Sequence, residues 1–359
     1  MKKNYFFGLF AATMLLTTSC QQENIFTEMW GEKEQTVTLN IALPEMGTAT
    51  RAYGTGLNAK YLQYAVYSLD DQGIINKLIE KTDVTMTVTS TNPPSTSIKL
   101  KLVPGTDYSL VLWADAYGND SNSPFEVKME DDGTTTMKIK SGIVKTNDDT
   151  PDAFFGSFVV AAGATGGFQI TDVQTNEQFS GDDIHLKLKR PFAQLNIAAT
   201  NSDLELAQKS DFTISQTAVS IASIKTYDTL DLRTGEVDGA STEMHYLSGN
   251  LPGNMQTTGN ATHTLLAMNY ILMAADKETV TVTFNYYGDQ GQEGKKTYTN
   301  VPLRRNWRTN IYGELFTKEV GITIEIAPGF ADQIDADGDN HPDTDNHYSG
   351  ENGFPLPNP

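Results

Sequence analysis

Five aspartates near the C-terminus form a dense group of side chains that could bind a metal ion. They are Asp335, Asp337, Asp339, Asp343 and Asp345. Hard cations such as Ca2+ prefer about six to eight oxygen ligands, and closely spaced carboxylates around the turn at Gly338 can supply them. The alternative is an acidic segment that is merely solvated. The sequence therefore leaves two interpretations of this stretch, a calcium site or a charged tail.

The same acidic stretch resembles one copy of a thrombospondin type-3-like calcium repeat. An EF-hand loop fits less well, because the glycine comes early and no glutamate occupies the closing position. His341 and His347 lie nearby, but a transition-metal site made with them is disfavoured. Apart from Ca2+ in this tail, no cofactor is expected.

Cys20 is the only cysteine of the chain, and its position indicates its chemistry. Residues 1–19 have the layout of a signal peptide, because Lys2 and Lys3 precede an apolar run from Tyr5 to Leu16. That run is too short to span the ~30 Å hydrocarbon core of a bilayer. A lone cysteine cannot form an internal disulfide in an exported chain, so another reaction of its sulfur is expected.

The segment from Leu16 to Cys20 resembles the lipobox of bacterial lipoproteins, in which the cysteine sulfur receives a diacylglycerol and the preceding peptide bond is cut. It departs from the family pattern at Thr17, where an aliphatic residue is usual. The resemblance implies lipidation at Cys20, a lipid-anchored tether over residues 20–36 and attachment to the outer membrane. A plain secretory signal with a free thiol is the alternative.

Composition and motifs disfavour several classes of function. The chain has 359 residues and a formal net charge of -19 at pH 7. Phosphate binding needs clustered Lys and Arg, so neither nucleic acid nor an anionic membrane surface is an expected partner. Because no HExxH, P-loop or Gly-x-Ser-x-Gly motif occurs and the histidines are scattered, we expect no enzymatic activity.

Apolar residues recur at every second position in many short segments, which is the period of a half-buried strand. Turn residues such as those of Asp70–Gly73 separate these segments, and Asp203–Lys209 is the best candidate for a short helix. Many short strands about ten residues apart indicate an all-β chain that forms β-sandwiches. The clearest alternation occurs in Val37–Leu43, Ile98–Leu102, Leu110–Leu112, Ile184–Leu188 and Val280–Phe284.

The chain is long enough for two hydrophobic cores. We expect an N-terminal β-sandwich domain over residues 37–189 and a C-terminal one over residues 190–326, because a loose Gly- and Asp-rich region precedes the boundary. Residues 327–359 are rich in Asp, Asn, Pro and Gly. They are expected to form an acidic, flexible tail.

Two motifs resemble segments that recur in fimbrillin-like lipoproteins of Bacteroidetes, the subunits of type V pili and their relatives. They are Lys189–Ile197 (KRPFAQLNI) and Pro302–Gly313 (PLRRNWRTNIYG). The lipid signal, the first alternating strand, Arg51 and the segment Tyr61–Tyr67 extend the resemblance over nearly the whole chain after the leader. It implies two tandem transthyretin-like sandwich domains and a location at the cell surface or in a fimbrium.

The resemblance also implies a mechanism of assembly. In type V pilins, an arginine-specific protease removes the first strand, and a C-terminal strand from a neighbouring subunit fills the groove. Other fimbrial subunits would then be the partners, and cleavage would occur between Arg51 and Ala52. The removable strand would contribute Val37, Leu39, Ile41 and Leu43, and the candidate donor strand Val320, Ile322, Ile324 and Ile326.

Each of these assignments has a simpler alternative. Arg51 is the first arginine of the chain and Arg190 the next, but an arginine in a loop is commonly just solvated. The segment Val320–Ile326 is equally well an ordinary final strand of the C-terminal domain. The nearby arginines, for which we favour a structural hydrogen-bonding role over an anion site, are Arg304, Arg305 and Arg308.

The sequence thus leaves two functions from different classes. The first is a fimbrial subunit precursor that assembles by strand exchange. The second is a monomeric surface lipoprotein that binds glycans or host proteins through its loops. Aromatic contacts for the second function would come from Trp113, Tyr117, Trp307 and Tyr348, although such residues more often pack in a core.

Overall fold

The computed structural model of the chain describes residues 34–44, 56–87, 94–140, 147, 150–162, 167–181, 184–239, 241–247, 253–256, 262–317, 322–328 and 348–349. These residues form strands and a single helix, α2 (Asn201–Lys209), so the all-β class is confirmed. No helix in this part of the chain is long and apolar enough to cross a membrane.

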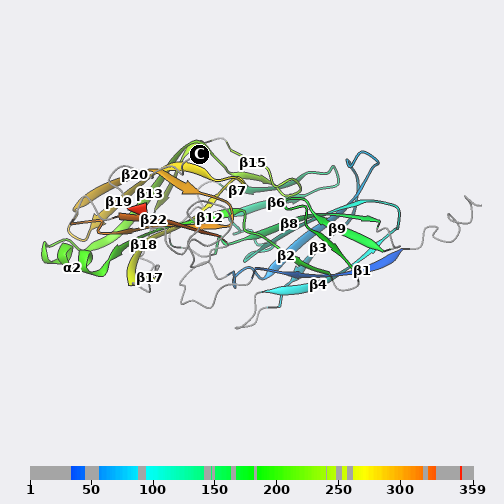
Figure 1. Ribbon diagram of the computed structural model, residues 1–359, viewed down its shortest axis with the longest axis horizontal. Helices are drawn as coiled ribbons and strands as arrows, with labels where there is room; N and C mark the ends of the chain where they lie inside the picture. Colours follow the sequence, from blue (N-terminus) through cyan, green and yellow to red (C-terminus); the bar gives the residue numbers. More distant parts are fainter. Residues whose placement is uncertain are drawn as a thin grey trace, which may run out of the picture.

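Two sheets face each other in the N-terminal part of the chain. The smaller has the order β11-β1-β4, formed by β11 (Ile184–Lys187), β1 (Gln35–Ala42) and β4 (Ser95–Leu102). The larger consists of β10 (Gln178–Ser180), β9 (Phe168–Asp172), β8 (Phe154–Ala162), β5 (Tyr108–Asp115), β2 (Tyr61–Leu69) and β3 (Ile75–Thr85) in that order. Their inner faces enclose a first hydrophobic cluster, to which β1 and β4 contribute every second side chain. Figure 1 shows β1 and β4 at one end of the elongated molecule.

Two further sheets enclose another hydrophobic cluster in the C-terminal part. One has the order β17 (Gly253–Gln256), β18 (Thr262–Leu272), β12 (Phe192–Thr200), β21 (Trp307–Gly313), β22 (Ile322–Pro328) and β23 (Tyr348–Ser349). The other has the order β16 (Ser241–Leu247), β13 (Ile214–Thr226), β19 (Glu278–Gly288) and β20 (Glu293–Leu303). In this cluster, alternate side chains of β12 and β19 meet from opposite sheets.

A fifth sheet joins the two parts of the chain. Its order is β15 (Val237–Asp238), β14 (Thr229–Asp231), β7 (Thr135–Ile139) and β6 (Phe125–Met129). The β7 and β14 strands are antiparallel, with Met137 opposite Leu230. Beneath this sheet, a further cluster combines side chains from both parts, including Trp113, Phe155 and Phe192. The rings of Trp113 and Phe125 meet edge to face at a centroid distance of 5.2 Å.

The joining cluster explains why two strands do not alternate. All eight residues of β5 are buried, because one face covers the first cluster and the other faces the joining sheet. In β12, likewise, eight of nine residues are buried. A strand that is buried on both faces has a nearly continuous apolar sequence. The division into domains at residues 189 and 190 stays a prediction, and the joining sheet crosses that division.

The link between β11 and β12 is anchored by a buried ion pair. The Nε of Arg190 donates to Oδ1 of Asp152 at 2.7 Å, and Nη2 donates to Oδ2 at 2.9 Å. Both residues are fully shielded from solvent, and the guanidinium lies over the ring of Phe154 at 4.4 Å. Because an unpaired buried charge is costly, this geometry holds the link in one position.

Two similar turns pack together next to this link. In the β9–β10 turn, Oδ1 of Asp172 accepts hydrogen bonds from two backbone N–H groups, and Asp231 does the same in the β14–β15 turn. Gly235 in the second turn has a φ of +76°, and a Cβ there would collide with Gln174 of the first. The guanidinium of Arg305 donates to the Gly235 carbonyl at 2.6 Å. These polar contacts connect the N-terminal and C-terminal parts of the chain, in addition to the joining sheet.

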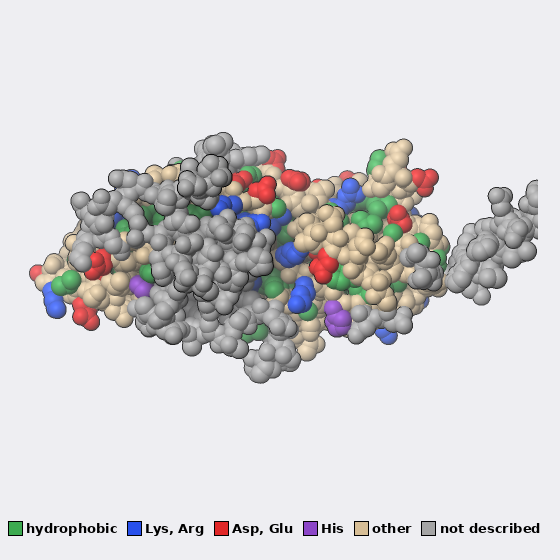
Figure 2. Space-filling view, in the orientation of Figure 1, with side chains coloured by type: hydrophobic (Ala, Val, Ile, Leu, Met, Phe, Trp, Pro, Cys, Tyr) green, Lys and Arg blue, Asp and Glu red, His purple; other side chains and the backbone are tan. Residues whose placement is uncertain are grey.

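On the face drawn in Figure 2, basic side chains gather near the middle of the molecule, with acidic ones beside them. The described surface of this face therefore mixes both signs of charge.

Candidate strand-exchange groove

The first strand occupies the centre of its sheet. It pairs with β4 in antiparallel register over its whole length, from Gln35 opposite Leu102 to Ala42 opposite Ser95. Its other edge pairs with β11 in parallel register, from Leu39 opposite Ile184 onward. Beyond the strand, the backbone N–H of Leu43 donates to the Pro94 carbonyl at 3.0 Å. Both edges of β1 are therefore hydrogen-bonded by other strands.

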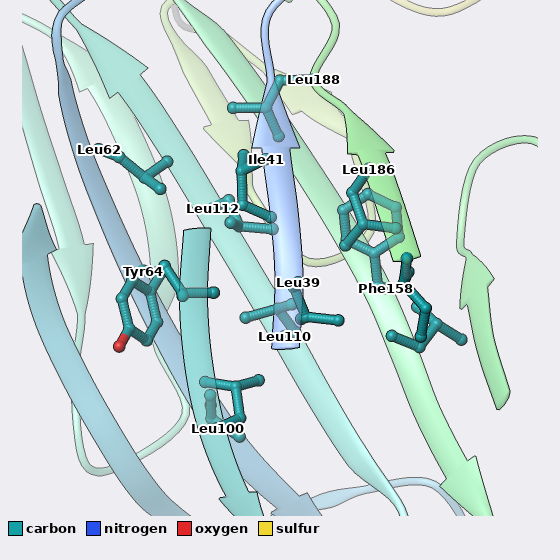
Figure 3. Packing of buried hydrophobic residues seen from close by; sticks show 14 of the residues in the cluster. Leu39, Ile41, Leu62, Tyr64, Leu100, Leu110, Leu112, Phe158, Leu186 and Leu188 are labelled. Carbon is teal, nitrogen blue, oxygen red and sulfur yellow. The ribbon is translucent and has the colours of Figure 1, made fainter. Parts of the chain in front are cut away.

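The predicted inward residues of this strand are confirmed as core residues. Leu39 and Ile41 are fully buried, and Val37 and Leu43 are 9% and 1% exposed. In Figure 3, Leu39 and Ile41 lie between Leu100 of β4 and Leu186 of β11, against the opposite sheet. The residues that alternate with these inward side chains, Thr38, Asn40 and Ala42, are half-buried, so the burial of β1 has the expected period of two.

These side chains contribute much of the stability of the N-terminal part. Burying one Val, Leu or Ile side chain stabilises a protein by about 1.5–3 kcal/mol, so the four together contribute about 6–12 kcal/mol. That sum is an upper estimate, because the unfolded chain already buries some apolar surface. A typical domain has a net stability of about 5–15 kcal/mol. Loss of β1 would therefore remove an amount comparable to the whole stability.

Removal of β1 would also leave its two neighbours without a ladder between them. Among the described strands, β1 alone forms a ladder with β11, and it links β11 to β4. The end of β11 stays attached through Lys189, which exchanges two backbone hydrogen bonds with Phe155. The result is an apolar groove with two unpaired edges, which an added strand can complete.

Tyr64 belongs to the same hydrophobic cluster as the inward side chains of β1, and its pKa reflects burial in that cluster. Its hydroxyl donates to the Glu80 carboxylate at 2.5 Å. Burial, followed by the hydrogen bond with Glu80, raises the pKa of Tyr64 to about 12.

The chain after the predicted cleavage site is fixed at Gly56. Cys20, Arg51 and Ala52 lie outside the described residues, and the description resumes at Gly56. This glycine is buried, with a φ of +69°, and a Cβ there would collide with the Phe154 ring. It therefore packs against the same side chain as Arg190. Sequence reasoning missed this anchor, because nothing local connects Gly56 with residues so distant in the chain.

The candidate donor strand is already paired within its own chain. The β22 strand is antiparallel to β21, from Ile322 opposite Gly313 to Pro328 opposite Trp307. Ile326 is buried, whereas Ile322 and Ile324 are half-buried against the C-terminal cluster. The other edge of β22 pairs with the two residues of β23. Val320 lies outside the described residues.

Asp203 fixes the chain shortly before β22. Its carboxylate accepts hydrogen bonds from the backbone N–H groups of Phe316 and Thr317, at 2.8 and 2.9 Å. Asp203 belongs to the first turn of α2, whose N-terminus is capped by the Thr200 hydroxyl. The cap and the carboxylate are typical of a helix start. The chain is thus held at Thr317, close to the start of β22.

The two motifs that resemble fimbrillins lie side by side. The β12 and β21 strands are parallel, with Gln194 opposite Arg308 and Asn196 opposite Asn310. The Arg308 guanidinium donates to Gln194 at 2.7 Å, and the Asn196 amide donates to Asn310 at 2.8 Å. All of them are buried. The motifs are therefore a paired set of buried polar groups, which favours one register of the two strands.

The other arginines of the second motif also have the expected structural role. Arg305 donates to the carbonyls of Met273 and Gly235, and burial lowers its pKa to about 10. Arg304 donates to the Ala275 carbonyl and lies over the Trp307 ring at 4.8 Å.

The aromatic residues proposed as surface contacts are mostly interior. Trp113 is fully buried, and Trp307 is 5% exposed, so the structure contradicts a surface role for both. Tyr117 is half-buried, and its hydroxyl donates to the Thr150 hydroxyl at 2.7 Å. Tyr348 belongs to β23. Trp113 is interior because it packs in the joining cluster against Phe125, and the ring of Trp307 is covered by the Arg304 guanidinium.

The aspartates proposed as calcium ligands, Asp335, Asp337, Asp339, Asp343 and Asp345, lie outside the described residues, so a calcium site there stays a prediction.

A family model matches residues 27–348, nearly the whole length of the chain. It is described as a family of unknown function, DUF6562. The chain belongs to this family. No curated protein matches the sequence.

Several solved structures are similar to the chain at low sequence identity. A candidate adhesin from Bacteroides thetaiotaomicron is 12% identical with a TM-score of 0.48, and the match covers 82% of this chain and 97% of the adhesin. The fimbrial anchor protein Mfa2 from Porphyromonas gingivalis is 14% identical with a TM-score of 0.38, covering 82% and 97%. A fimbrial protein from Bacteroides vulgatus is 12% identical with a TM-score of 0.39, covering 82% and 99%.

Proposed function

We propose that the protein is a lipid-anchored subunit precursor of a fimbrium or a related adhesive surface structure. In this proposal, an arginine-specific protease cuts after Arg51, and a strand from another subunit replaces β1. The central position of β1 is the observation that supports it. A strand that joins two others and fills an apolar cluster leaves a shaped groove when it departs.

The groove specifies the strand that can replace β1. A replacement must run antiparallel to β4 and parallel to β11, with apolar side chains at alternate positions that match Val37, Leu39, Ile41 and Leu43. Isoleucines at alternate positions give β22 such a face. We propose that β22 of a neighbouring subunit, extended by Val320, is the donor.

The position of β22 also favours a second function. The intact chain fills its own groove with β1 and pairs β22 with β21, so it has no need of a partner. A monomeric surface lipoprotein, or an anchor that keeps its first strand, would have this arrangement. Both functions share the proposed lipid at Cys20 and a location on the outer membrane.

N-terminal sequencing of the protein recovered from the cell surface separates the two functions. A start at Ala52, together with heat-resistant ladders on gels, is expected for an assembled subunit. An Arg51→Lys variant is the matched control, because it keeps the charge but removes the site of an arginine-specific protease. Recovery of wild-type chains that all begin at acylated Cys20 would overturn proteolytic assembly and support the monomer or anchor.

The acidic tail is tested separately. We propose that it binds Ca2+, and titration calorimetry of the intact chain should then show saturable heat. A variant with Asp337 and Asp339 changed to Asn should lose that heat, and no heat with the wild type would contradict the proposal.

A further inference from the structure

Within the described part of the chain, the hydrogen bonds of β1 are made with strands and a loop far in sequence from the proposed cleavage site. They connect residues from Gln35 to Leu43 with β4, β11 and Pro94. Residues 44–50 separate this paired segment from Arg51. Cutting the peptide bond after Arg51 therefore leaves these hydrogen bonds in place.

The side chains of β1 give a second reason for it to stay. Leu39 and Ile41 are fully buried between two sheets, and Leu43 is 1% exposed. Departure of the strand would transfer these groups to water and leave an unpaired backbone on both β4 and β11. Both changes oppose dissociation.

The chain after the cut is also fixed independently of β1. Gly56 packs against Phe154, and the backbone N–H of Ala59 donates to the Gly56 carbonyl at 3.1 Å. Cleavage would therefore not loosen β2, which begins at Tyr61.

We propose that β1 remains in its groove after cleavage as a noncovalent plug, so that strand replacement, and not proteolysis, releases the subunit from its lipid. The inference rests on the proposed processing at Arg51. The fragment that contains Cys20 and β1 keeps the body of the subunit at the membrane until another strand displaces it. Release is thereby coupled to assembly, and the open groove is never exposed to unspecific pairing.

The plug also defines how exchange must proceed. A donor strand cannot pair with β4 or β11 while β1 occupies both of their edges. It can therefore begin to bind only where β1 frays. The side of β1 towards β11 is bonded from Leu39 to Ala42, whereas its side towards β4 is bonded over the full strand. The N-terminal half of β1, with Val37 at 9% exposure, is therefore the expected point of entry.

The test uses residues 21–359 with a site for a sequence-specific endoprotease inserted within residues 45–50, so that cleavage does not depend on Arg51. After complete cutting, native gel filtration followed by mass spectrometry reports whether the fragment stays with the body. We expect the two to elute together in native buffer and to separate in denaturant. Elution of the free fragment from a native column would overturn the proposal.

Two variants of β1 test the cause of the retention. Ile41→Ala removes buried atoms, and the fragment should then exchange with an excess of labelled β1 peptide at least roughly tenfold faster. Thr38→Ala changes a side chain on the outer face and should leave the exchange rate unchanged. Equal rates for both variants and the wild type would contradict retention through the buried face.

Retention of β1 and cleavage at Arg51 can fail independently, and the experiments distinguish the two outcomes. If an arginine-specific protease does not cut the unaltered chain at Arg51, processing fails, but the engineered cut still tests the plug. If the engineered fragment leaves at once, the plug fails, but processing and assembly remain open to their own test.

Discussion

The first and the last long strands of this chain have the same sequence pattern and different surroundings. The β1 strand lies at the centre of a three-stranded sheet. One of its edges pairs with β4 over the whole strand, and the other pairs with β11 from Leu39 to Ala42. In β22, one edge is bonded along its length by β21, but the other meets the two residues of β23. Leu39 and Ile41 are fully buried, whereas Ile322 and Ile324 are half-buried.

This difference separates two roles that the sequence pattern cannot distinguish. The groove of β1 strongly requires a strand, because about 6–12 kcal/mol of burial depends on it. One buried and two half-buried isoleucines in β22 correspond to about 3–6 kcal/mol. Departure of β22 would also leave β18, β12 and β21 paired with each other. The chain thus combines a site that needs a strand with a strand that can leave at lower cost.

Deletion of either strand gives the largest expected effects. A chain that begins at Ala52 should lose the cooperative unfolding of the N-terminal part, because its cluster is opened. A chain that ends at Thr317 should keep a cooperative transition at a lower denaturant midpoint. Circular dichroism during urea unfolding measures both. Equal midpoints for the two deletions would contradict the difference in burial between β1 and β22.

An Ile→Ala substitution can be made in both strands. Ile41→Ala should cost about 3–5 kcal/mol of unfolding free energy, because it leaves a cavity among fully buried neighbours. Ile324→Ala should cost roughly 1–2 kcal/mol, because the side chain is half-buried and solvent can fill the space. Chemical denaturation of both variants provides the measurement, and a larger cost at Ile324 would contradict the account.

The attachment of the two strands to the rest of the molecule can be compared in the same way. Asp152→Asn would leave the buried Arg190 charge without its ion pair, next to β11, at an expected cost of about 3 kcal/mol. Asp203→Asn would weaken the hydrogen bonds to Phe316 and Thr317, before β22, at about 1–2 kcal/mol. Hydrogen exchange should show faster opening of β11 in the first variant and of β22 in the second. The reverse assignment would be inconsistent with these anchors.

Alkaline pH gives a smaller effect, to which Tyr64 contributes in the first cluster. Tyr64 loses its proton near pH 10 in the unfolded chain but near pH 12 in the folded one, because burial disfavours its charge. Its contribution to stability is therefore fully present below pH 10 and is lost as the pH rises through 12. Tyr64→Phe should show a shallower fall of the urea midpoint in this interval. If the urea midpoint depends on pH in the same way in the variant and the wild type, ionisation of Tyr64 is not coupled to unfolding.

Local patterns predicted the elements well. The alternating segments at Val37–Leu43 and Ile98–Leu102 correspond to β1 and β4, and the short helix was expected at Asp203–Lys209. The turn at Asp70–Gly73 is present as well, with Gly73 at a φ of +75°. Such features depend on side-chain period and turn geometry within a few residues, so the sequence determines them directly.

Long-range partners could not be predicted in the same way. Alternation indicates which face of a strand is buried but not which strand pairs with it, so the parallel pairing of β1 with β11 was missed. The sheet that joins β7 to β14 was missed for the same reason. The pair of Asp152 and Arg190 joins residues 38 positions apart, and no local signal connects them. Most of the groove around β1 is therefore visible only in the fold.

The groove that β1 fills must hold a strand. The most direct test of this requirement is a titration of the chain that begins at Ala52 with a synthetic peptide of residues 34–44, followed by circular dichroism and calorimetry. We expect saturable binding of one peptide per chain with recovery of cooperative unfolding, and no effect of a peptide with Leu39→Asp and Ile41→Asp. A shortened chain that is already stable and does not bind the peptide would contradict the claim.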